Sequence, residues 1–181
     1  MQTTSDPPTR RIYRGHGIEP ETVAMPVLGT RWDVLPRSSA TAVPVHQIMC
    51  RDVICATPDL EIGVVVDLML RHHIGSVPIV DARQRPIGII TKTDIVEHVH
   101  AALGSSGAHD PLPEDLKART AADVMMPLAF TLSAYATVAH AAMMMVNEDT
   151  HHVMIVSPSD DLVGVVSARD IAAWVLHTDG P

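Results

Sequence analysis

An internal repeat is the feature of this sequence that most restricts its fold. Shifting the chain against itself by 76 positions (121 minus 45) aligns residues 45–96 with residues 121–172 without a gap. Identical pairs at this shift include Met49 with Met125, Val77 with Val153, Ile79-Val80 with Ile155-Val156, Gly88 with Gly164, and Asp94-Ile95 with Asp170-Ile171. Many other pairs are chemically similar. The chain therefore contains two copies of one supersecondary unit, which are expected to pack together.

Each copy predicts the same order of elements, because turn residues separate one helical apolar pattern from two β-rich runs. In the first copy we expect a strand at 52–56, a helix capped by Thr57 and running to about Arg71, strands at 77–80 and 87–90, and a helix from Thr91. In the second copy we expect a strand at 129–132, a helix from Ser133 through Val146, strands at 153–156 and 162–166, and a helix from Ser167. A unit of about 50 residues is marginally stable alone. The expected fold is thus α/β (α+β): two tandem β-α-β-β-α repeats packed through their sheets as a pseudo-twofold module.

The other segments are interpreted as connections. The first 44 residues hold six of the 14 prolines and show no sustained periodicity, so we expect an extended arm, disordered over its first dozen residues. Apolar residues that would pin this arm to the module are Ile12-Tyr13, Val27-Leu28, Trp32 and Val34-Leu35. The predicted organisation is an arm at 1–44, repeats at 45–100 and 120–177, a linker at 101–119 with one helical turn within 110–117, and a tail at 178–181.

Composition disfavours several classes of protein. The formal net charge is -8 and only Lys92 and Lys117 are lysines, so no basic patch for duplex nucleic acid is expected. Cys50 and Cys55 fit neither a disulfide framework nor a zinc site, and we expect buried thiols in a reducing compartment. No apolar stretch approaches the roughly 20 residues that span a bilayer, and the first residues lack the apolar core of a signal peptide. A cytoplasmic protein without membrane insertion is expected.

Three segments carry a family resemblance. Residues 88–95 read Gly-Ile-Ile-Thr-Lys-Thr-Asp-Ile, residues 164–171 read Gly-Val-Val-Ser-Ala-Arg-Asp-Ile, and residues 76–81 read Ser-Val-Pro-Ile-Val-Asp. Over residues 45–175 the chain resembles the CBS domain pair, or Bateman module. The resemblance implies a non-catalytic regulatory module that binds an adenosine-type ligand: AMP, ADP, ATP or S-adenosylmethionine. It also implies a homodimer that relays ligand occupancy to a separate effector enzyme or transporter.

The resemblance further implies the residues that would contact such a ligand. Ribose hydroxyls would bond to Asp94 and Asp170. The residues that would bind phosphate are Thr91, Ser167, His72, His73, His151, His152, Lys92 and Arg169. Adenine would lie against Met49, Ile54, Ile74, Gly75, Ser76 and Val77 in the first copy, and against Met125, Phe130, His152 and Val153 in the second. Most of these adenine positions would belong to the core with or without a ligand.

A purely structural interpretation competes for the two aspartates. Thr91-x-x-Asp94 and Ser167-x-x-Asp170 have the spacing of a helix capping box, in which the acidic side chain returns to the cap amide. Their recurrence in both copies, each directly after Gly and two β-branched residues, favours ribose recognition. The second copy departs from the family pattern, with Met154 where the first has Pro78, and with Glu148 and Asp149 where the first has His72 and His73. We therefore expect two unequal sites.

Two other functions remain open. A divalent-metal-binding protein would use some of the 11 histidines, although adjacent histidines on a helix diverge and no HExxH or paired-cysteine motif is present. A ligand-free dimerisation scaffold would use apolar helix faces such as Met143-Met144-Met145. An acyl- or phosphoryl-transfer enzyme is disfavoured, because the sequence has no phosphate-binding glycine loop and no nucleophile elbow.

Overall fold

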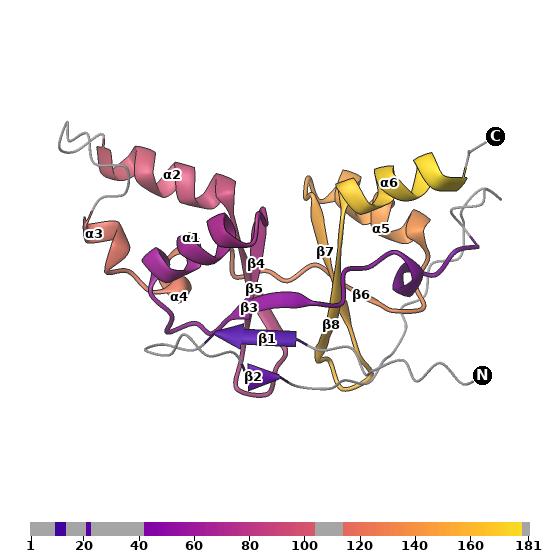
Figure 1. Ribbon diagram of the computed structural model, residues 1–181, viewed down its shortest axis with the longest axis horizontal. Coiled ribbons are helices and arrows are strands. Elements are labelled where there is room, and N and C mark those ends of the chain that lie inside the picture. The colour runs from indigo at the N-terminus through magenta and orange to yellow at the C-terminus, as the bar shows by residue number, and fades with distance from the viewer. Residues whose placement is uncertain (1–9, 14–20, 23–41, 104–113, 179–181) are drawn as a thin grey trace. The chain divides into compact units, whose positions relative to one another are not determined.

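The computed structural model describes residues 10–13, 21–22, 42–103 and 114–178, and the chain divides into two compact units. The first-repeat unit comprises residues 11–21 and 54–129, and the second-repeat unit comprises residues 1–10, 22–53 and 130–181. Figure 1 labels their elements. Among the described residues, no helix is long and apolar enough to cross a membrane.

The predicted order of elements is confirmed in both copies. The first has β3 (Val53–Ala56), α1 (Ile62–Arg71), β4 (Ser76–Val80), β5 (Pro86–Thr91) and α2 (Lys92–Leu103). The second has β6 (Thr131–Ser133), α5 (Val138–Asn147), β7 (His152–Val156), β8 (Leu162–Ser167) and α6 (Ala168–Thr178). Short helices at Val45–Gln47, α3 (Glu114–Lys117) and α4 (Ala121–Val124) lie outside this pattern. The fold is therefore mixed α+β, with two small sheets each followed by helices.

The two sheets have the same register, displaced by the length of the repeat. β3 and β6 lie parallel to β4 and β7, and each of these pairs with the next strand as an antiparallel hairpin. Val77 faces Ile90 in one hairpin, and Val153 faces Val166 in the other. Each parallel pair is joined by a helix, because parallel strands need a crossover connection.

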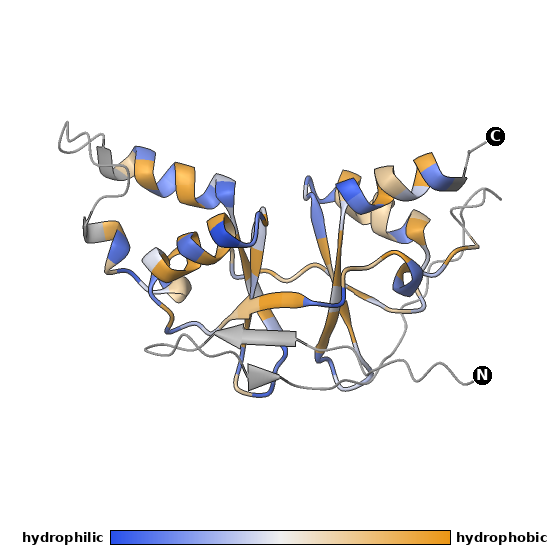
Figure 2. Cartoon of the chain, in the orientation of Figure 1, coloured by the Kyte–Doolittle hydropathy of each residue, from blue (hydrophilic) through white to orange (hydrophobic). Residues whose placement is uncertain are grey.

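Apolar helix faces and strands form one core in each unit. The apolar positions predicted for α1 are Ile62, Val65, Val66 and Met69; all are buried except Val66, which is half-buried, and Leu68 is buried with them. Figure 2 shows the mixture of hydrophobic and hydrophilic residues along the helices. The strands β4 and β7 are almost fully buried, and α1 packs on β4 as α5 packs on β7.

The predicted starts of α1 and α5 are wrong. Thr57 directly follows β3 and Ser133 ends β6, and the helices begin five residues later, after Glu61 and Thr137. The reason is tertiary. Residues 58–60 form a turn, in which the Leu60 amide donates to the Thr57 carbonyl. Glu61 then forms an isolated antiparallel bridge with Thr120, and the Ile62 amide donates to the Arg119 carbonyl at 2.8 Å, so the helix begins only after this bridge.

The same arrangement precedes α5 in the second-repeat unit. Thr137 bridges Pro44, and the Val138 amide donates to the Val43 carbonyl at 2.9 Å. Both bridges join the start of one sequence repeat to the body of the other. Val45 accordingly belongs to the second-repeat core, and Ala121 and Val124 belong to the first-repeat core. Each compact unit therefore contains the leading segment of the other sequence repeat.

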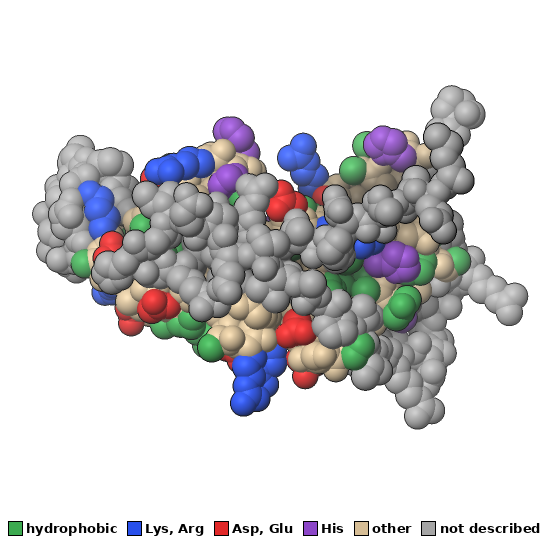
Figure 3. All heavy atoms as spheres, turned by 60° about the horizontal axis from the view of Figure 1, so that its bottom comes forward, with side chains coloured by type: hydrophobic (Ala, Val, Ile, Leu, Met, Phe, Trp, Pro, Cys, Tyr) green, Lys and Arg blue, Asp and Glu red, His purple; other side chains and the backbone are tan. Residues whose placement is uncertain are grey.

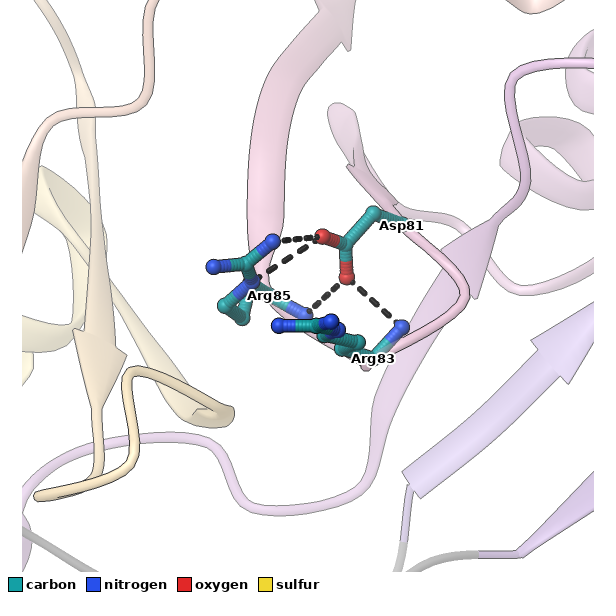
Figure 4. A network of polar contacts seen from close by, with 3 residues as sticks. All are labelled: Asp81, Arg83 and Arg85. Carbon is teal, nitrogen blue, oxygen red and sulfur yellow. Dashed lines mark hydrogen bonds and ion pairs between the residues drawn. The ribbon is translucent and has the colours of Figure 1, made fainter.

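Each hairpin turn is held by one polar side chain. Asp81 accepts hydrogen bonds from the amides of Arg83 (2.8 Å) and Arg85 (2.9 Å), and its other oxygen pairs with the Arg85 guanidinium (Figure 4). Partial burial acts to raise the pKa of Asp81, but these hydrogen bonds outweigh it and the pKa is lowered. At the equivalent position Ser157 accepts from the amides of Ser159 and Asp161.

Part of the N-terminal arm joins the first sheet. β1 (Arg10–Tyr13) lies between β2 (Glu21–Thr22) and β3 in the strand order β2-β1-β3-β4-β5. This agrees with the expectation that Ile12-Tyr13 attaches the arm to the module. The other expected anchors, Val27-Leu28, Trp32 and Val34-Leu35, lie outside the described residues, as do residues 1–9.

Candidate functional site

The first candidate site lies where β5 meets α2. Asp94 Oδ2 accepts from the Thr91 amide (2.6 Å) and from the Thr91 hydroxyl (2.7 Å), and the Asp94 amide donates to Thr91 Oγ1 (3.3 Å). Thr91 ends the strand and Asp94 lies in the first turn of the helix. Both residues are half-buried.

The second candidate site repeats this geometry between β8 and α6. Asp170 Oδ2 accepts from the Ser167 amide (2.7 Å) and hydroxyl (2.6 Å), and the Asp170 amide donates to Ser167 Oγ (3.2 Å). The capping box predicted from the spacing is therefore formed in both copies. Capping uses one oxygen of each carboxylate, and a carboxylate has about four acceptor positions, so a capping role leaves each aspartate able to accept further hydroxyl donors.

The first strand of each hairpin, β4 or β7, brings a second segment to the end of the strand that precedes the aspartate. Ser76 is the register partner of Thr91, and the Lys92 amide donates to the Gly75 carbonyl at 3.1 Å. In the second-repeat unit His152 is the register partner of Ser167, and the Ala168 amide donates to the His151 carbonyl at 3.0 Å. The two sites thus differ at equivalent positions: Gly75-Ser76 in one, His151-His152 in the other.

The strand that leads to each aspartate also makes a close glycine-methionine contact, at Gly88 in β5 and at Gly164 in β8. A Cβ on Gly88 would lie 2.6 Å from the Met126 carbonyl oxygen and 2.7 Å from Met125 Sδ. Met126 also pairs with Ile89 through two backbone hydrogen bonds of 2.9 and 3.2 Å. Only glycine, which has no Cβ, permits this close approach. Gly164 makes the equivalent close contact with Met49 and Cys50.

This arrangement corrects the sequence-based grouping of the expected adenine residues. Met49 was assigned to the first copy, but it packs on the core of the second-repeat unit, and Met125 packs on the core of the first. The leading segments bond to the partner repeat, and a local pattern cannot reveal such a pairing. The remaining expected residues keep their copy: Ile54, Ile74 and Val77 pack in the first-repeat core, Val153 is in the second, and the Phe130 carbonyl accepts from the Met154 amide.

The expected phosphate-binding residues differ in exposure. His72 and His73 are exposed after the end of α1, where His73 has a positive φ of 53°. Asp149, its counterpart after α5, has the same left-handed backbone with φ of 49°. Lys92 and Arg169 are exposed at the first residues of α2 and α6. On the face drawn in Figure 3, Lys and Arg side chains lie in separate small groups among acidic and apolar ones.

His151 and His152 have different surroundings. His151 is exposed, whereas His152 is half-buried. Burial lowers the pKa of His152, repulsion from His151 lowers it further, and the Asp170 carboxylate acts in the opposite direction. His152 is therefore a neutral imidazole at neutral pH, able to offer a hydrogen bond but not a charge.

Cys50 is a site neighbour that the sequence interpretation missed. The sequence predicts buried thiols for both cysteines. This is confirmed for Cys55 and wrong for Cys50, which is exposed. Cys50 forms an antiparallel bridge of two backbone hydrogen bonds with Val165. Partial burial of the thiol raises its pKa, and the carboxylates of Asp170 and Asp52 add to the rise. The repeat contains a signal for this position, because Cys50 aligns with Met126, which forms the equivalent bridge with Ile89.

Comparison with known protein families identifies the same domain in both halves of the chain. The family model for the CBS domain matches residues 45–101 and 121–177. The chain belongs to the CBS domain family. CBS domain pairs are generally regulatory, non-catalytic modules, and the two matched segments coincide with the two copies of the repeat.

Some relatives and solved structures resemble this chain over about three quarters of its length. An uncharacterized protein of Methanopyrus kandleri is 33% identical over 130 residues, 72% of this chain and 61% of that protein, so the match spans less than two thirds of that relative. The CBS domain pair of protein MJ0100, solved with 5'-methylthioadenosine and S-adenosyl-L-methionine, is 23% identical, with a TM-score of 0.60 over 76% of this chain and 98% of that one.

A second solved structure is the CBS domain of a bacterial Mg²⁺ transporter of the CNNM/CorC family in complex with ATP. It is 16% identical, with a TM-score of 0.62 over 76% of this chain and 89% of that one. At these identities the structures establish the shared CBS fold. Within the described ranges of this CBS pair, no three His, Cys, Asp or Glu side chains gather in a way that would hold a metal ion.

Proposed function

We propose that this chain is a regulatory CBS pair that binds an adenosine-type ligand beside Asp94 or Asp170 and relays its occupancy to a separate partner protein. The observation that carries the proposal is an arrangement of residues that occurs in both units. In each unit a half-buried aspartate with unused acceptor positions lies at a helix N-terminus and bonds to a hydroxyl, after a strand that makes a tight glycine-methionine contact. Hydroxyl donors of a ribose match the carboxylate, and helix N-termini favour anions.

The ligands of the structural neighbours support this class. The neighbour MJ0100 was solved with 5'-methylthioadenosine and S-adenosyl-L-methionine, and the CNNM/CorC neighbour with ATP. All three compounds contain adenosine, and they differ in the charge that follows the ribose. We propose AMP, ADP, ATP or S-adenosylmethionine as the ligand of this chain.

The two sites are proposed to be unequal, with one of them weak or empty. Basic residues His72 and His73 follow α1 in the first-repeat unit, whereas Glu148 and Asp149 occupy the same positions after α5. An acidic pair disfavours a phosphate group. The proposal therefore assigns phosphorylated ligands to the site at Asp94.

The experiment measures ligand binding calorimetrically at neutral pH for AMP, ATP, S-adenosylmethionine and 5'-methylthioadenosine. Asp94→Asn and Asp170→Asn remove the charge at one site each. Losing a hydrogen bond to a charged acceptor costs about 1.5–3 kcal/mol, or roughly a 10- to 100-fold loss of affinity. AMP and ATP binding should fall by this factor in Asp94→Asn and remain in Asp170→Asn.

A third capping box supplies the matched control. Thr120 donates its amide and hydroxyl to Asp123 Oδ2 at 2.8 Å each, and neither residue lies at a candidate site. Asp123→Asn should leave ligand affinity unchanged. A chain that binds none of the four compounds at millimolar concentration would contradict the proposal. A chelator-sensitive melting temperature would instead support the metal-binding alternative.

We propose a homodimer formed through helix faces. Leu70 on α1 and Val146 on α5 are 62% and 81% exposed, and they occupy the same position in the two repeats. Leu176 on α6 is 78% exposed. Light scattering after size exclusion should give twice the mass of one chain, and Leu70→Lys with Val146→Lys should give a single-chain mass. Tyr135→Ser, which removes an exposed aromatic outside these helices, is the control.

A further inference from the structure

A shallow pocket opens on one side of α5, in the second-repeat unit. Its lining residues are His140, Met143, Met144, Asn147 and Glu148. His140 precedes the two methionines by three and four positions, and residues with this spacing lie on the same face of a helix. His140, Met143 and Met144 are half-buried. One imidazole and two thioethers therefore border the same small space.

These side chains suit a soft metal ion. Thioether sulfur is a soft, polarizable ligand that suits Cu(I), and imidazole also binds copper well, whereas Mg²⁺ and Ca²⁺ prefer oxygen ligands. Side chains three and four residues apart on a helix have Cβ atoms about 5–6 Å from each other. The flexible methionine side chain lets its sulfur approach an ion held by the neighbouring imidazole. The three donors can therefore share one ion.

Thr137 holds the imidazole of His140 in place. The Thr137 amide and hydroxyl lie 3.2 and 3.3 Å from His140 Nδ1. The amide can only donate, so Nδ1 accepts and the ring proton is on Nε2. A threonine hydroxyl accepts as well as donates, so when Nε2 binds an ion the ring proton moves to Nδ1 and donates to Thr137 Oγ1. Metal-bound histidines usually donate their second N–H to such a fixed acceptor, which orients the ring.

The charge near the pocket favours a cation. Glu148 lines the pocket and Asp149 follows it in the chain, and both side chains are exposed. The whole chain has a formal net charge of -8. Solvent and salt screen exposed charges, so these carboxylates add attraction for a cation, and the sulfur and nitrogen donors supply the selectivity.

The first repeat lacks the three donors. The positions 76 residues earlier hold Val64, Asp67 and Leu68. Asp67 forms an ion pair with Arg71, which lies on the same helix, α1. The repeated fold therefore forms without an imidazole and two thioethers on this helix, and the donor set belongs to the second repeat alone.

We propose that His140, Met143 and Met144 form a binding site for one soft monovalent cation, Cu(I), with the imidazole Nε2 and the two thioether sulfurs as its ligands. Among the described residues, the search for metal clusters of His, Cys, Asp and Glu finds none, but thioether ligands lie outside that group. The site is distinct from the positions of Asp94 and Asp170, and it does not rest on the proposed binding of an adenosine-type ligand.

The test uses Ag⁺ as the probe, because it has the charge of Cu(I), prefers the same soft donors and is stable in air. The protein is the full chain with Cys50→Ser, since the exposed Cys50 thiol would compete for the ion. Silver nitrate is added in chloride-free buffer at neutral pH, without nucleotide, and carbon-13 NMR follows the methionine methyl groups. The Met143 and Met144 signals should shift together along one saturation curve. Met126, which is exposed and outside the pocket, should not shift.

Variants of the three donors identify the ligands. Met143→Leu and Met144→Leu each remove one sulfur and keep a similar apolar volume. His140→Asp removes the imidazole and keeps an acceptor for the Thr137 bonds. Each variant should weaken Ag⁺ binding at least about tenfold, because losing even an outer partner of a metal ligand costs 10- to 100-fold in affinity. Met145→Leu, a buried core methionine next to the pocket residues, is the matched control and should bind Ag⁺ unchanged.

Three outcomes would overturn the proposal. Equal shifts at Met126 and at the two pocket methionines would show unspecific binding to exposed sulfur, and this measurement needs no variant of the site to fold. Unchanged affinity in Met143→Leu and Met144→Leu would exclude the thioethers as ligands. Displacement of Ag⁺ by an excess of Ca²⁺ would indicate oxygen ligands instead.

Discussion

Met49 and Gly164 are in such close contact that a Cβ on the glycine would lie 2.5 Å from the methionine Sδ. The contact joins the leading segment of the first sequence repeat to the last strand of the second. At the equivalent place in the first-repeat unit, a Cβ on Gly88 would lie 2.6 Å from a backbone atom, the Met126 carbonyl oxygen.

Substituting these glycines should therefore destabilise the protein to different degrees. A forced extra methyl group costs about 1–3 kcal/mol, and Gly88→Ala should cost more than Gly164→Ala because a backbone carbonyl yields less readily than the end of a methionine. Urea unfolding measures both. Gly63→Ala is the control: its Cβ would lie 3.9 Å from Lys117 Cβ, an ordinary contact, and alanine in helix α1 should stabilise by up to about 1 kcal/mol. Equal effects at all three positions would contradict this account.

Asp81 should stabilise the first hairpin in a pH-dependent way. Its pKa is lowered from the ordinary 3.8, so its contribution is present above that value and is lost as the pH falls through the lowered pKa. Asp81→Asn keeps an acceptor for the backbone amides but loses the charge that pairs with Arg85, and should cost about 0.5–1.5 kcal/mol at pH 7. Unfolding at pH 7 and pH 3 should show this difference shrinking in acid. A difference that is constant with pH would exclude a role for the carboxylate charge.

His152 should titrate below the ordinary histidine value of 6.5. Because its folded pKa is lowered, the neutral ring stabilises the fold at higher pH, and this contribution is lost as the pH falls below 6.5. Proton NMR of the imidazole follows the titration directly. His151→Ala should raise the midpoint by removing a repulsion, and Asp170→Asn should lower it further by removing an attraction. Shifts in the opposite directions would show that the ring lies elsewhere.

The Cys50 thiol should react more slowly than its exposure suggests. Partial burial and the nearby carboxylates raise its pKa above the ordinary 9.0, and the thiolate is the reactive form. Alkylation by iodoacetamide at pH 8, followed by mass spectrometry, should be slow at Cys50 and slower still at the buried Cys55. Asp170→Asn should accelerate the reaction at Cys50. An unchanged rate in that variant would place Asp170 too far from the thiol to act on it.

The repeat determined the fold class from the sequence alone. Apolar spacing and turn residues located the hairpins at 76–91 and 152–167 almost to the residue, because both signals act between near neighbours. The spacing of Thr91 with Asp94 likewise predicted a contact that the structure contains. Local patterns were sufficient wherever the bonding partners lie close together in sequence.

Only the tertiary structure decided where α1 and α5 begin and which methionine faces which site. Thr57 and Ser133 are good caps by local preference, but each is followed by a turn, and the helix begins only after a long-range bridge, from Glu61 to Thr120 or from Thr137 to Pro44. Those bridges also carry Met49 and Met125 to the opposite repeat. Their hydrogen bonds join residues more than 50 positions apart, and a pattern that reads only neighbouring residues contains no information about such a pairing.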